Sequence, residues 1–319
     1  MSRRFFIAIT AGAAIALCAS AGTASARAVG HNPLGRILGV VPSRALGTAS
    51  TGSNLIYNGG PVLDTNTAYA IFWAPSNYPM APSYQSLINR FYADVAAATD
   101  ASAPSNVYYA ATQYGPGTVG STATAAGSLH NFSTFGGSYV DTTPISNGCK
   151  DRYTKICVSD SQVASEISKD LPKAGWSAGT GKIFFMFTPK GVGSCFSSGS
   201  CSFSQWCAYH SWSGSLLYAN MPFADTVSRA CDVGYHPNSS IDPNADATIN
   251  VTSHEHNESI TDPFGSAWYN SGGSEDGDLC AWNFGSVGSN GANQTINGHS
   301  YILQQEWSNL SAGCVLQGT

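Results

Sequence analysis

Three stretches of the chain have the continuous apolar, β-branched and aromatic content of buried strands. They are residues 67–73 (TAYAIFW), 181–188 (GKIFFMFT) and 216–223 (LLYANMPF). Short runs of this composition, bounded by turn residues, are typical of strands in the core of a sheet. A shorter run at 107–109 (VYY) predicts one more strand. The pattern therefore predicts a largely buried β-sheet.

Elsewhere apolar residues recur at steps of three and four, the spacing that puts them on one face of a helix. Residues 83–98 carry this pattern at Tyr84, Leu87, Ile88, Phe91, Tyr92 and Val95. A second helix is predicted over 161–171, where Ser161 can cap the N-terminus. A third ends before Pro263 and can be capped by Asn244 or Asp246. The expected fold is α+β, a twisted mixed β-sheet with packed helices, stapled by disulfides and with a loop-rich C-terminal part.

The N-terminus has the three parts of a secretory signal peptide. Arg3 and Arg4 form a basic start, residues 5–18 an apolar run, and residues 24–26 (ASA) a small-residue cleavage site. The run is shorter than the roughly 20 apolar residues that span a bilayer, and no other stretch approaches that length. We expect cleavage after Ala26, a linker or pro-segment over 27–53, and one secreted, catalytic-like domain over 54–319.

Composition agrees with export. Charged residues are only 10% of the chain, which also contains 34 Gly and 15 Tyr, whereas intracellular proteins usually have a Lys- and Glu-rich surface. The net charge of -5 gives no electrostatic reason to expect nucleic acid or an anionic membrane as a partner. We expect a secreted monomer that acts on an extracellular protein or peptide.

The cysteines predict a disulfide framework. Nine are present, and Cys18 is removed with the signal peptide. An even number remains, which in an exported chain indicates four disulfides. The chain has no C-x2-C pair, the spacing that is typical of a zinc-thiolate site. Proximity in sequence favours pairing Cys149 with Cys157 and Cys280 with Cys314, and leaves the others open: Cys195, Cys201, Cys207 and Cys231.

The third predicted helix carries the candidate chemistry. His254 and Glu258 are four residues apart and share one face of it, with Glu255 beside them. An imidazole and a carboxylate on a buried face need partners, and a divalent metal would satisfy both. This H-E-x-x-E arrangement differs from the zinc-binding H-E-x-x-H only in its last position. It predicts zinc, or another divalent metal, on His254 and Glu258, with Glu255 as general base.

A third metal ligand is expected from the Gly-rich stretch 272–280, which holds Glu275, Asp276 and Asp278. Asp278 is the first candidate, Glu275 its competitor, and Asp262 a further one. In the alternative without a metal, His254 hydrogen-bonds Glu258 or a backbone carbonyl, and Asp276 and Asp278 cap a turn. The chain has no G-x-S-x-G motif, so a lipase-type serine nucleophile is not supported.

The order of elements and the His254-Glu255 pair resemble the core of zincin metallopeptidases. The resemblance implies a zincin-like core, in which residues 216–223 form the edge strand that binds peptide substrate antiparallel. The 20-residue offset from Glu258 to Asp278 is similar to that of the third ligand in thermolysin-like enzymes. The resemblance to zincins implies a metalloprotease-like hydrolase, most specifically an endopeptidase.

A second resemblance covers more of the chain. Residues 58–63 (NGGPVL), 70–73 (AIFW), 207–210 (CAYH), 261–265 (TDPFG) and 301–303 (YIL) with Cys314 are similar to the phosphate-induced, EXORDIUM-like extracellular proteins. Many plant members lack the His-Glu pair on this helix and have no established enzymatic activity. This resemblance implies the alternative function, a non-catalytic protein associated with the cell wall. The chain resembles a bacterial-type member that keeps the H-E-x-x-E helix.

Overall fold

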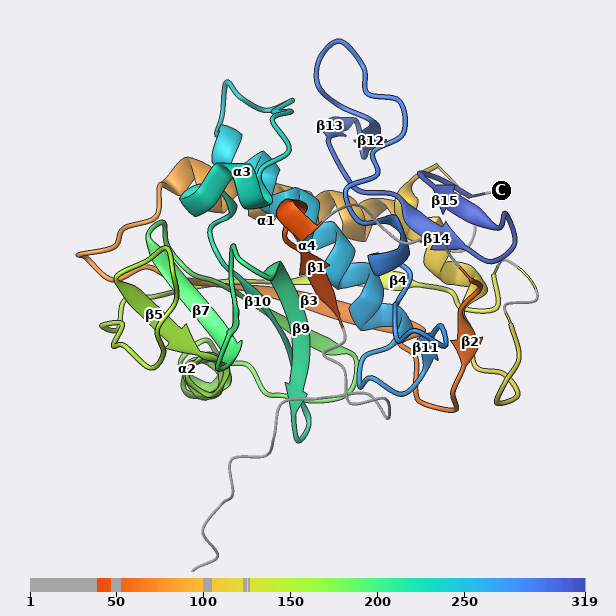
Figure 1. Ribbon diagram of the computed structural model, residues 1–319, viewed down its shortest axis with the longest axis horizontal. Helices are drawn as coiled ribbons and strands as arrows, with labels where there is room; N and C mark the ends of the chain where they lie inside the picture. The colour runs from red at the N-terminus through yellow and green to blue at the C-terminus, as the bar shows by residue number, and fades with distance from the viewer. Residues whose placement is uncertain (1–38, 47–52, 100–104, 123–124, 126, 319) are drawn as a thin grey trace, which may run out of the picture.

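A computed structural model describes residues 39–46, 53–99, 105–122, 125 and 127–318 (Figure 1). The predicted signal peptide lies outside these residues, as do 27–38 and 47–52 of the predicted linker or pro-segment. No helix within the described ranges is long and apolar enough to cross a membrane.

A six-stranded mixed sheet forms the centre of the molecule. Its order is β1 (Val40–Pro42), β9 (Trp206–Ser213), β10 (Leu216–Met221), β6 (Lys182–Phe187), β3 (Thr65–Trp73) and β4 (Phe132–Asp141). The last four strands run parallel to one another, whereas β9 is antiparallel to β10 and β1 is antiparallel to β9. The three long strands predicted from the sequence are β3, β6 and β10, so those predictions are confirmed.

Two details of the predicted sheet are wrong. Residues 107–109 begin a 3-10 helix, η2 (Val107–Gln113), because the Asn106 side chain caps it and accepts a hydrogen bond from Tyr108 N at 3.0 Å. The predicted edge strand, β10, lies inside the sheet between β9 and β6. It is joined to β9 by a two-residue turn at Gly214, whose φ of 63° is a conformation that glycine adopts readily. The sheet edge nearest β10 is β1, within the stretch predicted to be a linker or pro-segment, and the opposite edge is β4.

Helices cover both faces of this sheet. Apolar residues of α1 (Pro82–Ala98) and α4 (Pro243–Thr261) share a core with Ile183, Phe185 and Phe187 of β6. The alternate β6 residues Phe184 and Met186 pack in a second core with α2 (Asp160–Lys173). Figure 1 shows α2 on the opposite side of the sheet from α1 and α4. Because both faces are buried, these strands are continuously apolar in sequence instead of alternating.

The predicted helices are present, but their caps differ from those expected. Ser159 caps α2 in a capping box with Gln162, two residues before the expected Ser161. Asp242 caps α4 and accepts hydrogen bonds from the backbone N–H groups of Asn244 and Ala245. Pro243 follows at the first helical position, where its missing N–H costs nothing.

Short elements make up the rest of the chain, including the loop-rich C-terminal part that the sequence predicts. A smaller sheet contains β5 (Ile156–Ser159), β7 (Val192–Ser197) and β8 (Ser200–Cys201). Two-stranded pairs join β2 (Ile56–Tyr57) to β11 (Trp268–Tyr269), β12 (Gln294–Ile296) to β13 (His299–Tyr301), and β14 (Glu306–Ser308) to β15 (Gly313–Val315). The remaining short helices are η1 (Arg44–Leu46), η3 (Ala224–Val227), α3 (Ser228–Cys231) and η4 (Asp278–Cys280).

Four disulfides join the eight described cysteines. The pairs are Cys149–Cys157, Cys195–Cys201, Cys207–Cys231 and Cys280–Cys314. The predicted framework and its two proposed pairings are confirmed. The third disulfide ties β9 to α3, and the fourth ties η4 to β15. Because these sulfurs are bonded to one another, they are not free to act as a zinc-thiolate site.

Candidate metal centre

Helix α4 is polar and yet buried along nearly its whole length. Every side chain from Ala245 to Thr261 is buried, and the helix lies between the central sheet and the C-terminal loops (Figure 1). Burying polar groups is costly unless each one finds a partner. The last two turns hold His254, Glu255 and Glu258, each with 0% of its surface exposed. The partners of these three side chains therefore decide what the helix does.

His254 and Glu258 lie one turn apart and face each other. The distance from His254 Nε2 to Glu258 Oε1 is 2.9 Å, but the two groups are not oriented as a hydrogen bond, and neither ring nitrogen has a hydrogen-bond partner among the described residues. Two donor atoms that converge without a hydrogen bond are the arrangement of ligands that share a cation. Both ligand types, imidazole nitrogen and carboxylate oxygen, bind Zn²⁺.

The loop 275–278 closes over this pair. The Asp278 N–H donates to Glu258 Oε1 at 2.9 Å, and a ligand atom of Asp278 lies within 4.8 Å of those of His254 and Glu258. Gly277 rests against the imidazole, where an added Cβ would lie 2.8 Å from the His254 ring. Only glycine allows this approach. The structure thus brings together the three side chains that the sequence nominates as first-choice ligands.

His210 on β9 is a member of the site that the sequence prediction missed. Its Nε2 lies 3.2 Å from the backbone carbonyl oxygen of Asp262, which can only accept, so Nε2 carries the proton and donates. Its Nδ1 lies 3.3 Å from Glu255 Oε2 and 3.8 Å from Glu258 Oε2. His210, Glu255 and Glu258 form a second set of possible metal ligands, with Glu258 common to both sets.

The charge state of the His210–Glu255 contact follows from burial. Burial lowers the pKa of His210 to about 4, so its imidazole is neutral near pH 7 and Nδ1 presents a lone pair. Burial raises the pKa of Glu255 to about 8. A lone pair that faces a carboxylate at this distance requires a proton on Glu255 or a cation nearby. The contact can therefore store a proton or help to hold a metal.

Seven carboxyl groups and the two histidines form what we term the α4 cluster. Its members are His210, His254, Glu255, Glu258, Asp262, Glu275, Asp276, Asp278 and Glu306, of which only Asp278 is partly exposed. The ion pairs that these residues make within the described chain involve histidine and neither Lys nor Arg. Carboxyl groups buried in this number are stable only when they are protonated or bind a cation.

Burial raises the pKa values of the carboxyl groups in this cluster, and repulsion from neighbouring carboxylates adds to the rise for Glu258, Glu275, Asp278 and Glu306. The pKa rises to about 6 for Asp262, Asp276 and Asp278. It rises well above its ordinary value for Glu258, Glu275 and Glu306. One or both carboxyl oxygens of Glu258, Glu275 and Glu306 have no hydrogen-bond partner among the described residues. These oxygens are available to a divalent cation.

The other sequence candidates lie close to this pair but have different neighbours. Glu275 Oε1 is 3.9 Å from His210 Nε2, on the His210 side of the cluster. Asp262 Oδ1 accepts from the N–H groups of Ser266 and Ala267 and so holds the loop after α4. The turn-capping role considered as the alternative is present as well, since Asp278 Oδ2 accepts from Glu275 N at 3.1 Å. That role leaves the other Asp278 oxygen for a cation.

His256 has a structural role on the opposite side of α4. It is 1% exposed, contacts Asn66 Oδ1 at 2.9 Å and the Tyr108 hydroxyl at 3.1 Å, and packs edge-on against Phe185. Burial lowers the pKa of His256 to about 3, so the ring is neutral and links α4 to β3, β6 and η2. It takes no part in the α4 cluster.

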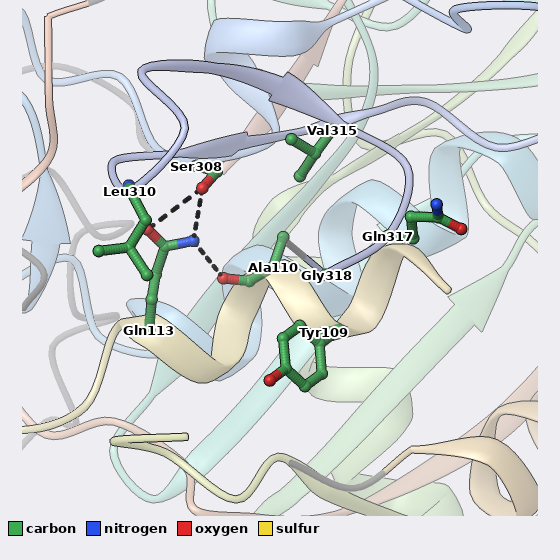
Figure 2. Close-up of a pocket in the computed structure, with 8 residues that line it drawn as sticks. All are labelled: Tyr109, Ala110, Gln113, Ser308, Leu310, Val315, Gln317 and Gly318. Atoms are coloured by element: carbon green, nitrogen blue, oxygen red, sulfur yellow. Dashed lines mark hydrogen bonds between the residues drawn. The ribbon is translucent and has the colours of Figure 1, made fainter. Parts of the chain in front are cut away.

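A small cavity at another place in the molecule does not offer a second site. It lies between η2 and the β14–β15 pair, and Figure 2 shows Gln113 bonded there to Ala110 and Ser308. Its volume of about 10 Å³ is room for roughly one water molecule. None of its eight lining residues belongs to the α4 cluster.

Comparisons with protein-family models, with curated proteins and with solved structures find no match to this chain. The resemblances to zincin metallopeptidases and to EXORDIUM-like proteins therefore stay predictions, and the function is inferred from the geometry of the site.

Proposed function

We propose that this protein is a secreted, metal-dependent hydrolase of the zincin-like endopeptidase type. The observation that carries the proposal is the convergence of His254 Nε2 and Glu258 Oε1 at 2.9 Å without a hydrogen bond, inside a buried cluster of carboxylates. His254, Glu258 and Asp278 would hold the cation, and Glu275 is the next candidate ligand. The four disulfides support secretion, because such bonds persist in oxidising compartments.

Each residue has a separate task in this proposal. Bound Zn²⁺ would supply a Lewis acid that lowers the pKa of water. Glu255 accepts the proton of the attacking water and returns it to the leaving amine, as a general base and then a general acid. Its Oε2 faces His210 Nδ1 at 3.3 Å, where the lone pair of the neutral imidazole accepts a hydrogen bond from Glu255 while the carboxyl group holds the proton. Glu255 ionises at a lower pH when a cation is near, which suits it to act as a base near pH 7.

Metal analysis and peptide hydrolysis by purified variants test this proposal. Glu255→Gln should keep the metal and lose about two to four orders of magnitude in rate, whereas His254→Ala should lose both. Asp246→Asn is a matched control, because Asp246 is a buried carboxylate on the same helix that bonds to Asn238 outside the cluster. Hydrolysis is measured for each protein with Gly39 in place and again after Gly39→Ala. Gly39 lies against the His210 ring of the site.

Two outcomes would contradict the ligand set. Loss of metal from Glu255→Gln would assign the cation to the set His210, Glu255 and Glu258. A wild type that neither retains nor rebinds a divalent metal would exclude the metal-dependent mechanism altogether.

The second candidate is a non-catalytic extracellular protein of the EXORDIUM-like kind, associated with the cell wall. One observation favours it: His254, Glu255 and Glu258 are each 0% exposed, so the site in this conformation is closed to substrate. Here a cation would only neutralise the buried carboxylates. Metal retention without hydrolysis in either background would favour this function.

A further inference from the structure

The N-terminal segment, residues 39–46, lies along β9 as an added strand and covers the Glu255 and His210 side of the site. The His210 N–H donates to the Gly39 carbonyl at 2.9 Å, and the Ser43 N–H donates to the Gln205 carbonyl at 2.9 Å. Between these bonds Val40 pairs with Tyr209 and Val41 with Ala208. The segment therefore occupies the sheet edge next to His210.

The same segment contacts the chemical groups of the site. The Val41 N–H donates to Glu255 Oε1 at 3.2 Å. Gly39 has a φ of 59°, and a Cβ added there would lie 1.9 Å from His210 Nδ1. Main-chain atoms of the segment thus cover both the candidate base and its histidine partner. Gly39 and Val41 are buried, so the contact is packed and excludes solvent.

Noncovalent contacts hold the segment in place, and the buried Val41 side chain packs in the main core. Trp282 Nε1 donates to the Pro42 carbonyl at 2.8 Å, and Ser43 Oγ donates to the Phe203 carbonyl at 3.3 Å. The exposed Arg44 bonds to the Asp232 carbonyl and lies 6.0 Å from the Trp282 ring. The four disulfides all join residues from Cys149 onward, and none of them ties residues 39–46 to the body. Noncovalent contacts therefore hold the segment on β9, as they hold a bound peptide.

We propose that residues 39–46 are a tethered ligand on the peptide-binding edge of β9 in this protein. The substrate class is an extended peptide that pairs antiparallel with β9 and presents its main chain to Glu255, after the segment has left. Adding a strand to a free sheet edge is a general mode of peptide recognition, in which main-chain bonds give affinity. This inference rests on the proposed function for the chemistry, but the occupancy of the β9 edge can be tested without it.

The Gly39→Ala variant tests the inference in the chain that follows the signal peptide. Alanine would meet the His210 ring and is strained at this φ, so the segment should release β9 without a change in any ligand. A fluorescent peptide with the sequence of residues 39–46 should then bind the variant and not the wild type, as measured by anisotropy. Hydrolysis of a general peptide substrate should rise by about tenfold, the factor that corresponds to a strain of about 1.4 kcal/mol.

Two other variants serve as controls for misfolding and for non-specific effects of substitution. Arg44→Ala removes an exposed anchor without strain in the core, and it should give the same two changes at smaller amplitude. Leu46→Ala alters an exposed side chain, 62% accessible, and should leave both measurements at the wild-type level. Near-ultraviolet circular dichroism identifies any variant that has lost its tertiary packing.

The outcomes separate this inference from the proposed function. Peptide binding gained by Gly39→Ala and Arg44→Ala, with no hydrolysis by any variant, supports the peptide-binding edge of β9 and overturns the endopeptidase. Equal hydrolysis by wild type and both folded variants, with no peptide binding, overturns the tethered ligand and leaves the endopeptidase standing. Absence of both binding and hydrolysis overturns the inference too.

Discussion

At the scale of single residues, the site depends on how closely groups approach each other. The His254 imidazole is fixed on one side by Glu258 and on the other by the main chain at Gly277. A ligand whose ring orientation is set by its neighbours binds metal more tightly than one that must be ordered on binding. In the proposed site Gly277 would therefore affect the affinity for a metal without being a ligand.

Replacing Gly277 by alanine should weaken metal affinity by about 10- to 100-fold, as loss of supporting contacts does in other metal sites. The added Cβ would lie 2.8 Å from the His254 ring and would shift the ring or the Asp278 loop. Competition with a chelator of known affinity measures the effect. Gly179→Ala is the control, because a Cβ there meets nothing within 4 Å. Equal affinities for the two variants would refute the proposed contact.

Sequence reasoning located the residues on α4 but not His210. The pair His254 and Glu258 is visible because four residues make one helical turn. His210 lies 44 residues before His254, on strand β9. It comes close to Glu255 only because β9 packs beside α4. One available signal was the Gly214-Ser215 dipeptide between 206–213 and 216–221, which is typical of a hairpin turn. A hairpin turn there predicts a strand over the β9 residues, paired with β10. That pairing places β10 inside the sheet instead of at its edge.

At the scale of elements, helix caps show how local chemistry sets boundaries. Ser159 both accepts from Gln162 N at 3.3 Å and is bonded through its own N–H to the Gln162 side chain at 2.9 Å. Ser161, the cap expected from sequence, lies inside the first turn. A short serine-rich stretch offers two similar caps, and the reciprocal bond with Gln162 selects the first.

Ser159→Ala should lower the free energy of unfolding by about 1 kcal/mol, the usual cost of losing an N-cap. Ser161→Ala should change it by less than half as much, because alanine favours the interior of a helix. Urea denaturation followed by circular dichroism compares the two. A larger loss for Ser161→Ala would contradict the observed cap.

The strand β1 could not have been predicted from its own residues. Val40–Pro42 is too short to show an alternating pattern, and it is a strand because β9 supplies the pairing partner. The same applies to η2, where the apolar run at 107–109 suits a strand until Asn106 caps a helical turn. Long elements such as α1 and β6 carry enough residues for periodicity and composition to decide their type.

At the scale of the whole molecule, the α4 cluster places many acidic groups in the core. The chain has 19 acidic residues, and seven of them are in this cluster. Without a cation they are protonated or repel each other, and either state is less favourable than coordination. Cation binding should therefore stabilise the entire fold, because the unfolded chain has no preformed site.

Removing divalent cations with EDTA at pH 7.5 should lower Tm, and adding back Zn²⁺ should restore it. At a free metal concentration of 100 times Kd, the stabilisation would be about 2.7 kcal/mol. Differential scanning fluorimetry measures the shift, and His254→Ala serves as the control that should not respond. A wild type with the same Tm before and after chelation would contradict a cation in the cluster.

The disulfide between Cys280 and Cys314 gives the molecule an order of assembly in time. Asp278 is two residues from Cys280, and both belong to the single turn η4. In a reducing cytosol that bond would not persist, and the loop that brings Asp278 and Gly277 to His254 would lose its covalent anchor. If His254, Glu258 and Asp278 bind zinc as proposed, thiol oxidation would precede a complete set of ligands. A reduced chain would then bind zinc more weakly than the oxidised chain.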